Sequence, residues 1–383
     1  MSRRPPSFTI GIEEEYLLVD QQTGDLATDP PKAMVDECQS AADGQFSPEL
    51  MRSQIEVGTK VCESVAEARA DLARLRNTVI DVAAGHGLAP IAASTHPSAH
   101  WWQQKPTEKD RYQALADEMQ TPARRLLICG MHVHVGIDDD AVRIDLMNQM
   151  SYFLPHLLAL STSSPFWDSR ETGLKSYRLT VFDALPRTGL PERFSSFAEY
   201  NRHVDILRRA GLIEDSSKIW WDMRPSNRYP TLETRVMDVC TRLDEAVSLA
   251  ALVQCLLRML YRLRENNQRW RVYTLMLIRE NRWRAIRYGT DAGMVDLAKG
   301  DVVPFATLLD EIIDMVAEDA DALGCTQEIR ALRHILRNGT SAHRQVATYQ
   351  KALTKGCDSA EALRAVNKQL IAETREHRNF VAG

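Results

Sequence analysis

The sequence lacks an excess of charge of either sign. Its 383 residues contain 47 lysines and arginines against 52 aspartates and glutamates, which gives a formal net charge of -5. Proteins that hold nucleic acid or an anionic membrane normally carry a basic segment or face. The charge balance therefore argues against both kinds of partner and favours a small molecule.

The cysteine patterns of disulfide-rich and zinc-binding proteins are also missing. The 7 cysteines are scattered, odd in number and nowhere spaced as C-x-x-C. We therefore expect neither a disulfide framework nor a zinc knuckle, and a reducing cytoplasm is the expected location. The cysteines are expected in the core, and Cys129, beside a predicted strand, is the one nearest to a candidate site.

Long hydrophobic runs are absent as well. The segment 1–8 contains two arginines and two prolines but no apolar run, which indicates neither a signal peptide nor a membrane anchor. The most apolar later stretch, 246–257, stops at Arg258 and is shorter than the roughly 20 residues that a membrane span requires. We expect it to be a buried helix.

No internal repeat, low-complexity tract or flexible linker divides the chain, which predicts a single domain over residues 1–383. The predicted strands are 8–19, 88–92, 124–137, 219–224 and 232–236, and the predicted helices are 65–84, 144–161, 197–210 and a run from 244 onward. A strand-rich part over about 8–240 followed by a helical part over about 241–383 is typical of the α+β class. We therefore expect a largely antiparallel sheet.

Five strand-like segments place reactive side chains two residues apart. Because a strand directs residues i and i+2 to the same face, each segment presents such a pair together. Glu14 is expected on the face opposite to its two neighbours. The five pairs are Glu13 and Glu15, Gln54 and Glu56, His132 and His134, Asp222 and Arg224, and Glu233 and Arg235.

Each pair alone has an ordinary explanation, because a half-solvated antiparallel strand alternates charged and apolar residues. The pair of His132 and His134 is harder to explain in this way. Two imidazoles on a strand rich in valine and methionine need partners if they are buried, and a metal or a phosphate is a natural one. If all five faces line one concave sheet, they form a cleft in which carboxylates meet arginines.

That combination of groups suits phosphoryl transfer. Carboxylate and imidazole ligands suit Mg²⁺ or Mn²⁺, which bridge substrate phosphates. Arginines bind phosphate oxygens and stabilise the charge that develops during transfer. Since the sequence has neither a G-x-x-x-x-G-K-[ST] loop nor a G-x-G-x-x-G fingerprint, a bound nucleotide is expected to be held by metals and arginines on a sheet.

The chain resembles the carboxylate-amine ligases of the glutamate-cysteine ligase type 2 family, in its YbdK-like branch. The similar segments are, in order, GIEEEY, SPELMRSQIEVGT, GMHVHVGI, SPFWDSRETGLKSYR, WWDMRPS and TLETRVMD. The resemblance implies an α+β, glutamine synthetase-like fold with a curved, mainly antiparallel sheet. It also implies helices on the convex side, a helical C-terminal third, and ATP with divalent ions on the concave face.

Roles for single residues follow from the same resemblance. It implies that the divalent-metal ligands are Glu13, Glu15, Glu49, Glu56, His132 and Glu233. It further implies that His134, Arg224 and Arg235 bind the phosphates of ATP, with the two arginines acting as catalytic residues, and that Arg178 binds a substrate carboxylate.

The implied reaction is ATP-dependent amide formation. A substrate carboxylate, such as that of glutamate, takes the terminal phosphoryl group of ATP, and an amine then displaces phosphate from the acyl phosphate. The resemblance implies ATP and Mg²⁺ (or Mn²⁺), small-molecule carboxylate and amine substrates and weak glutamate-cysteine ligase activity, and it is compatible with a homodimer. The amine is not identified by the sequence.

Two other functions stay open on the sequence alone. A strand with H-x-H is also typical of metal-dependent hydrolases of the amidohydrolase type, although there the motif lies near the N-terminus and further strand histidines follow it. The other alternative is a non-catalytic nucleotide sensor on the ligase fold.

Several remaining features are expected to be structural. The pairs Trp101-Trp102 and Trp220-Trp221 are expected in the core or at its rim rather than against adenine. The arginine-rich segment from Arg279 to Arg287 is predicted to be an amphipathic helix, and the sequence assigns it no chemical role.

Overall fold

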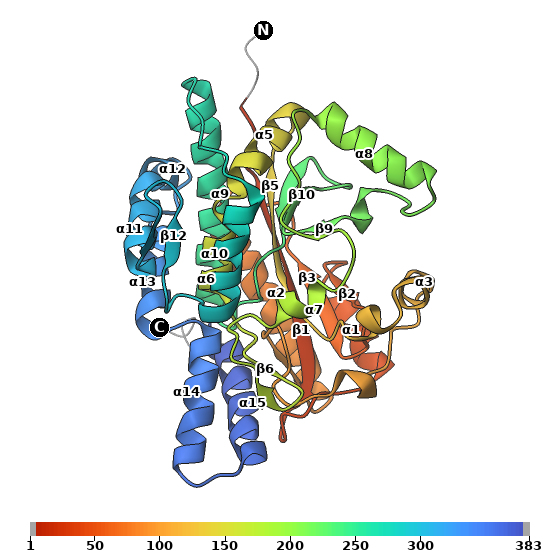
Figure 1. Ribbon diagram of the computed structural model, residues 1–383. Coiled ribbons are helices and arrows are strands. Elements are labelled where there is room, and N and C mark those ends of the chain that lie inside the picture. Colours follow the sequence, from red (N-terminus) through yellow and green to blue (C-terminus); the bar gives the residue numbers. More distant parts are fainter. Residues whose placement is uncertain (1–4, 378–383) are drawn as a thin grey trace.

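The computed structural model describes residues 5–377, which are built around an antiparallel sheet of seven strands (Figure 1). Its strand order is β10-β11-β5-β1-β3-β2, and β4 pairs with the second half of β1. The seven strands are β1 (Ile10–Asp20), β2 (Phe46–Pro48), β3 (Gln54–Gly58), β4 (Leu88–Ile91), β5 (Met131–Gly136), β10 (Met223–Pro225) and β11 (Thr231–Thr234).

One face of this sheet is covered by helices. The helix α2 contacts β1, β3 and β4, α9 contacts β1 and β5, and α5 contacts β10 and β11. The side chains of Ile12, Tyr16, Val133 and Val135 alternate with the reactive residues of β1 and β5 and are fully buried. The three covering helices are α2 (Val65–Gly85), α5 (Asp140–Met150) and α9 (Leu243–Glu265).

Glu14 lies on this helix-covered face, as the alternation along β1 predicts. Its carboxylate accepts two hydrogen bonds from the Arg76 guanidinium of α2, at 2.6 and 2.8 Å, and Glu14 and Arg76 are 0% and 1% exposed. Arg76 also donates to the carbonyl oxygens of Cys240 and Thr241, both at 2.8 Å. This ion pair therefore joins the central strand, its covering helix and the segment before α9.

The helix α9 is the central helix of the core. Within the described part of the chain it is the one helix long and apolar enough to cross a membrane, by length and composition alone, but most of it is buried inside the protein. It contacts α2, α5, α6, α12 and α13. Its apolar surface is accounted for by this packing, which confirms the prediction of a buried helix over 246–257.

The remaining elements surround this arrangement. The other helices are α1 (Lys32–Ala41), α3 (Asp110–Met119), α4 (Thr121–Arg124), α6 (Leu154–Ser161), α7 (Arg178–Phe182), α8 (Phe197–Arg209), α10 (Leu275–Tyr288), α11 (Phe305–Met315), α12 (Ala317–Ala322), α13 (Thr326–Asn338), α14 (Ser341–Thr354) and α15 (Ser359–Arg375). The short 3-10 helices are Trp101–Gln103 and Ser216–Lys218. The small strand pairs are β6 (Phe166–Trp167) with β7 (Arg170–Glu171), β8 (Thr188–Gly189) with β9 (Trp220–Trp221), and β12 (Met294–Asp296) with β13 (Asp301–Val303).

The predicted fold class is confirmed, but some predicted bounds were wrong. The strand predicted over 124–137 is only Met131–Gly136, because the residues before it form α4 and a connecting loop. The helix predicted over 144–161 is split into α5 and α6. Pro155 lies in the first turn of α6, where a missing backbone N–H is tolerated, whereas inside a continuous helix it would remove a hydrogen bond and clash with the preceding turn.

Candidate active site

The strand register brings the predicted side chains together on the sheet face that α2 and α9 leave uncovered. β1 is the shared neighbour of β3 and β5, and β5 is paired in turn with β11. The residues directly opposite one another are Glu13 and His132, Glu15 and Glu56, His134 and Glu233, and Glu233 and Arg224.

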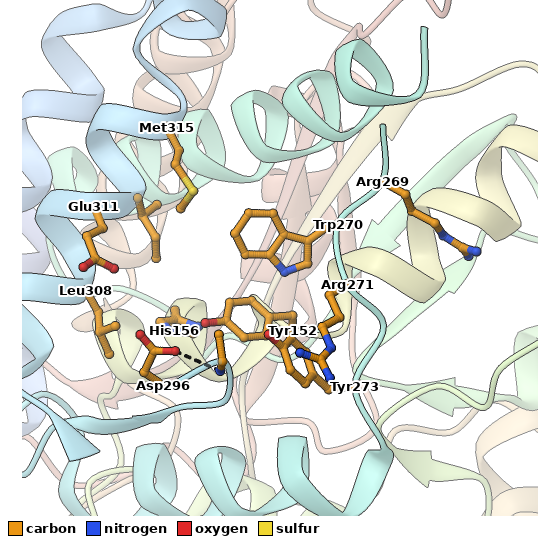
Figure 2. A pocket seen from close by; sticks show the side chains of 12 residues that line it. Tyr152, His156, Arg269, Trp270, Arg271, Tyr273, Asp296, Leu308, Glu311 and Met315 are labelled. Atoms are coloured by element: carbon orange, nitrogen blue, oxygen red, sulfur yellow. Dashed lines mark hydrogen bonds between the residues drawn. The ribbon is translucent and has the colours of Figure 1, made fainter. Parts of the chain in front are cut away.

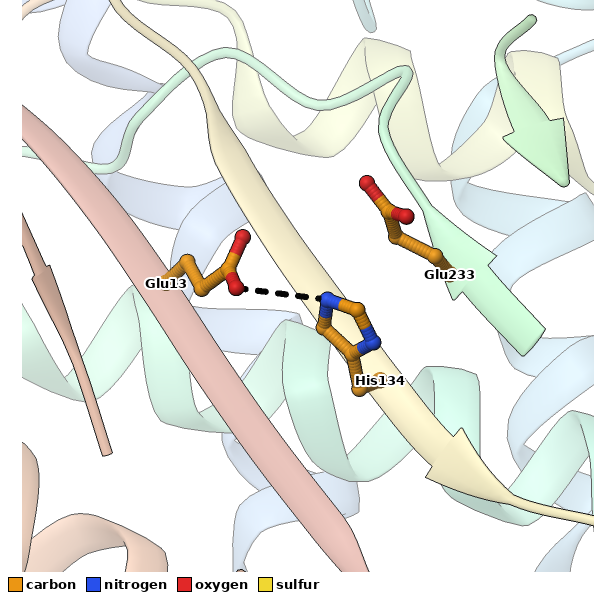
Figure 3. Close-up of side chains that lie close together, drawn as sticks. All are labelled: Glu13, His134 and Glu233. Atoms are coloured by element: carbon orange, nitrogen blue, oxygen red, sulfur yellow. Dashed lines mark ion pairs between the residues drawn. The ribbon is translucent and has the colours of Figure 1, made fainter. Parts of the chain in front are cut away.

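Glu13 is at the centre of this group. Its Oε2 lies 3.1 Å from His132 Nδ1, and its Oε1 lies 3.4 Å from His134 Nε2. Burial alone raises the pKa of Glu13, but hydrogen bonds to the two histidines outweigh it and hold the pKa well below the ordinary value. Figure 3 shows Glu13, His134 and Glu233 directed toward one another from three neighbouring strands.

The two histidines differ in their surroundings. Burial and the positive charge of Arg235 lower the pKa of His132 to about 4, so its imidazole is neutral near pH 7. Its Nε2 is buried and has no hydrogen-bond partner among residues 5–377. His134 Nδ1 lies 2.9 Å from Thr231 Oγ1; burial lowers the pKa of His134, but the hydrogen bond to Glu13 raises it above the ordinary value. His132 is thus suited to offer a lone pair to a cation.

Three further carboxylates crowd the same face. Burial raises the pKa of Glu15 to about 7, and the charge of Glu49 adds to the rise. Burial, with the charges of Glu13, Glu49 and Glu15, raises the pKa of Glu56 well above its ordinary value. Glu15 accepts a hydrogen bond from the backbone N–H of Gly130 at 2.7 Å. Ionised together, these carboxylates repel one another unless a cation lies between them.

The donor set fits a divalent cation of the hard type. Glu13, Glu56 and His132 can each offer a ligand atom within 4.8 Å of the others, and so can Glu13, His134 and Glu233. Carboxylate oxygens with an imidazole nitrogen suit Mg²⁺ or Mn²⁺. The unpartnered His132 Nε2 and the raised pKa values of Glu15 and Glu56 both fit a cation bound at this place. The metal-ligand assignments themselves stay predictions.

Glu233 is held between two arginines. Arg224 donates to it at 2.9 and 3.2 Å, and Arg235 forms a second, closer ion pair with it. Arg224 also donates to the carbonyl oxygens of Ser217 and Ile219, both at 2.7 Å. Burial raises the pKa of Glu233, but the two arginines dominate and leave it well below the ordinary value. Arg224 is therefore anchored to the protein, whereas the buried Nε of Arg235 has no hydrogen-bond partner in the described chain.

Arg178, the predicted substrate-carboxylate contact, is the first residue of α7 and is only 3% exposed. It donates to the carbonyl oxygen of Arg235 at 3.2 Å and lies directly against Gly130, where a Cβ atom would be 2.3 Å from Arg178 Nη2. Burial lowers its pKa. Its Nε is buried and, within the described residues, unpartnered. The guanidinium is thus placed near Glu15 with a donor still unused.

A cavity of about 590 Å³ adjoins the carboxylate cluster. Glu13, Glu56 and His134 line it, together with residues that sequence reasoning missed: Lys60, which follows β3, and Arg228, Tyr229 and Thr231 around the β10–β11 turn. The Tyr229 ring meets the His134 ring edge to face, with 6.0 Å between centroids. Lys60, Arg228 and Tyr229 lie outside the strands, where alternation gives no signal, whereas Thr231 begins β11 and shares the face of Glu233. A volume of this size is in the range of small-molecule sites.

The comparisons with known proteins agree with one another. The sequence profile of glutamate-cysteine ligase family 2 matches residues 9–368. A Rhodospirillum rubrum protein provisionally named glutamate-cysteine ligase 2 is 60% identical over 375 residues, covering 97% of this chain and 96% of its own. A protein of the same name from Jannaschia sp. is 55% identical and covers 96% of each chain.

The chain belongs to glutamate-cysteine ligase family 2. This membership confirms the enzyme class predicted from the sequence, an ATP-dependent carbon-nitrogen ligase, and it favours that class over a hydrolase or a sensor. A solved glutamate-cysteine ligase from Francisella tularensis, in complex with AMP, has the same fold at 14% identity, with a TM-score of 0.67 over 97% of this chain and 90% of its own.

Asp222 was predicted to share a strand face with Arg224, and the structure does not place it in the site. It lies at a bend between β9 and β10, so the alternation that would pair it with Arg224 is interrupted. Its carboxylate accepts a hydrogen bond from Arg282 at 2.7 Å instead. Gln54 is likewise used internally, since its amide donates to the Ile128 carbonyl oxygen at 2.6 Å and to Cys129 Sγ at 3.6 Å.

A second cavity, of about 270 Å³, lies among the helices (Figure 2). Part of its wall is aromatic, with the Tyr152 ring 5.3 Å from that of Trp270 and 5.5 Å from that of Tyr273. The acidic residues in its lining, Asp296 and Glu311, already lie 2.9 and 3.5 Å from the ammonium group of Lys299. It contains no cluster of the kind found on the sheet.

Proposed function

We propose that this protein joins a small-molecule carboxylate, such as that of glutamate, to an amine through an acyl-phosphate intermediate. A carboxylate oxygen attacks the terminal phosphorus of ATP, the bond to the bridging oxygen breaks, and ADP leaves. The amine nitrogen then attacks the acyl carbon, phosphate leaves with the carbonyl bond restored, and the nitrogen loses a proton. No covalent protein intermediate is needed in this sequence of steps.

The side chains on the sheet would act by position and charge. Arg178 would bind the substrate carboxylate, because its guanidinium is buried and retains a free donor. Arg235, with Arg224 beside it, would stabilise charge on the transferred phosphoryl group. His134, at the edge of the 590 Å³ cavity, would contact an ATP phosphate. ATP would occupy that cavity.

Divalent cations would be held by Glu13, Glu15, Glu49, Glu56, His132 and Glu233. When bound, Mg²⁺ or Mn²⁺ would neutralise phosphate charge and orient the polyphosphate. The observation that carries the proposal is the convergence of these carboxylates, two imidazoles and Arg235 beside the cavity, with Arg178 of α7 next to them; both arginines are buried, and each has an Nε–H without a partner among the described residues.

The test is ADP release with Mg²⁺, ATP and a matrix of carboxylic acids and amines. We expect release that requires both an acid and an amine, with glutamate among the active acids. Replacement of Glu13 by Gln or of His132 by Ala should abolish it, while the matched surface change Glu63→Gln should leave it unchanged. Turnover that persists in Glu13→Gln contradicts the ligand assignment.

Two other outcomes would replace the proposal. Amide hydrolysis without ATP would favour a metal-dependent hydrolase, and ATP binding with no turnover across the whole matrix would favour a sensor.

Capture of an acyl phosphate by hydroxylamine, giving a hydroxamate, distinguishes the proposed intermediate from direct transfer.

Three further aspects stay proposals. A cytoplasmic location is supported by the scattered, unbridged cysteines. A single domain is supported by the packing of α9, from the helical part, on β1 and β5. A homodimer remains a prediction to be tested by the mass of the protein in solution.

A further inference from the structure

Arg282, in the arginine-rich segment that sequence reasoning left without a role, binds two carboxylates at once. It donates to Asp222 at 2.7 and 3.1 Å and to Asp183 at 2.6 and 2.9 Å. Arg282 is 8% exposed and Asp222 2% exposed. Four hydrogen bonds from one planar guanidinium fix the relative position of three chain segments: α10, the end of α7 and the bend before β10.

Each of these carboxylates lies on a segment that carries a proposed active-site arginine. Asp183 directly follows α7, the five-residue helix that begins with Arg178. The backbone carbonyl of Asp222 accepts hydrogen bonds from the N–H groups of Arg235 at 2.8 Å and Val236 at 3.1 Å. Arg282 is therefore linked to the backbone of Arg235 through a single residue, Asp222. It is linked to Arg178 through Asp183 and the short helix α7.

The two routes meet again at the site. Arg178 donates to the carbonyl oxygens of Arg235 and Val236 at 3.2 and 3.5 Å. The same helix α10 fixes the chain before α7, since the Ile286 carbonyl accepts hydrogen bonds from the N–H groups of Lys175 and Ser176. Because Arg178 already lies against Gly130, a small shift of α7 would move its guanidinium out of place.

We propose that Arg282 is a positioning residue that sets the places of Arg178 and Arg235 through Asp183 and Asp222. The consequence for catalysis rests on the proposed function, but the positional effect does not. Lysine cannot replace arginine here, because a single ammonium group lacks the planar fork that spans two carboxylates.

A purely stabilising role is the competing explanation. Buried ion pairs often contribute little net stability, and replacing all partners by neutral groups of similar size is frequently tolerated. The positions of Arg178 and Arg235, in contrast, depend on the geometry of the hydrogen bonds from the Arg282 guanidinium. They do not depend on the net contribution of these ion pairs to the free energy of unfolding. The two explanations therefore predict different effects for a variant that is stable but lacks the fork.

The first experiment compares Arg282→Lys with Arg284→Lys by amide hydrogen exchange. Arg284 is two residues along the same helix and donates to the carbonyl oxygens of Ala292 and Gly293, away from the site. We expect exchange in 177–183 and 220–237 to accelerate at least tenfold in Arg282→Lys only. Equal protection of these segments in both variants, or equal loss over the whole chain, overturns the proposal.

The second experiment measures ADP release by the same variants. We expect Arg282→Lys to raise KM for the carboxylate at least tenfold, through Arg178, and to lower kcat, through Arg235. An unchanged KM for the carboxylate in a variant with accelerated exchange contradicts the link to Arg178. If the wild-type protein releases no ADP with any acid and amine, the proposed function fails, while the exchange result still decides the positional role.

A triple variant covers the case in which Arg282→Lys does not fold. Replacing Arg282 by Met, Asp183 by Asn and Asp222 by Asn removes every charge of the cluster and leaves no buried ion unpaired. We expect a folded protein with the same accelerated exchange in 177–183 and 220–237 and the same rise in KM. Wild-type exchange and kinetics in this variant would show that the cluster positions nothing.

Discussion

Two adjacent glutamates of β1 should respond in opposite ways to the same substitution. Glu14 lies under α2 and is paired with Arg76, whereas Glu13 lies on the site face between two histidines. We predict that Glu14→Gln destabilises the protein and leaves metal binding intact. We predict that Glu13→Gln weakens metal binding and changes the stability little. Both substitutions lie on the same strand and replace a glutamate by a glutamine of nearly equal size, so the two variants differ only in the face of the sheet that is altered.

The magnitude for Glu14→Gln follows from its burial. The substitution leaves the Arg76 guanidinium, 1% exposed, with carbonyl partners but no counter-charge. Breaking one partner of a buried pair costs about 3–5 kcal/mol. With an unfolding entropy of about 2.1 cal/mol/K per residue, a chain of this length should lose roughly 5 °C in Tm.

The magnitude for Glu13→Gln is smaller in stability and larger in binding. The Glu13 side chain is 30% exposed, and an amide can still form a hydrogen bond with either histidine. We expect a change within about 1 kcal/mol, as for other partly exposed positions. Loss of a central carboxylate should lower the affinity for Mn²⁺ by about 10-fold to 100-fold or more.

Thermal unfolding followed by circular dichroism, with Mn²⁺ titration calorimetry on each variant, makes the comparison. Equal destabilisation by the two substitutions would refute the assignment of opposite faces. Loss of Mn²⁺ binding in a folded Glu14→Gln protein would refute it as well, because the Glu14 carboxylate binds Arg76 and Tyr16 and none of the proposed metal ligands.

Three shorter predictions follow from other contacts. Gly130→Ala should reduce kcat/KM for the carboxylate at least tenfold in a folded protein, because the new Cβ would occupy the space of Arg178, 2.3 Å from its Nη2; a normal KM for the carboxylate would contradict that placement. Glu56→Gln should raise the Tm of the metal-free protein while weakening Mn²⁺ binding, because burial and three neighbouring carboxylates disfavour its charge; a lower Tm without metal would contradict the repulsion. Burial lowers the pKa of His156 from 6.5 to about 4, so at pH 5 this imidazole takes up a proton in the unfolded chain alone, and the contribution of His156 to stability should fall by about 2 kcal/mol between pH 8 and pH 5. Urea unfolding of His156→Phe should lose that part of the pH dependence, and an unchanged dependence would contradict the attribution to His156.

Local patterns in the sequence were enough to find much of the site. The alternation in β1 separates Glu13 and Glu15 from Glu14 because successive side chains of a strand point to opposite faces. The same rule selected His132 and His134. The strand rule failed at Asp222, where a bend ends the alternation. The helix prediction failed between Met150 and Leu154, because the helical periodicity continues across the break between α5 and α6.

Contacts between distant segments were beyond such patterns. The partner of Glu14 is 62 residues away in sequence, and Arg282 binds Asp183 and Asp222 from 99 and 60 residues away. The helical period places both arginines on an apolar face, with Leu72 and Ile80 one turn from Arg76 and Ile278 and Ile286 one turn from Arg282, but it does not identify their carboxylate partners. Their roles depend on burial, which is a property of the packed chain.

The sequence by itself determined which side chains share a strand face, because the period of a strand is local geometry. Only the tertiary structure decided which strands are neighbours, and therefore that Glu13 meets His132 and that Glu233 lies between His134 and Arg224. The pairing of β5 with both β1 and β11 joins segments about a hundred residues apart. Such pairing is set by the packing of the whole sheet on its helices, which no single segment encodes.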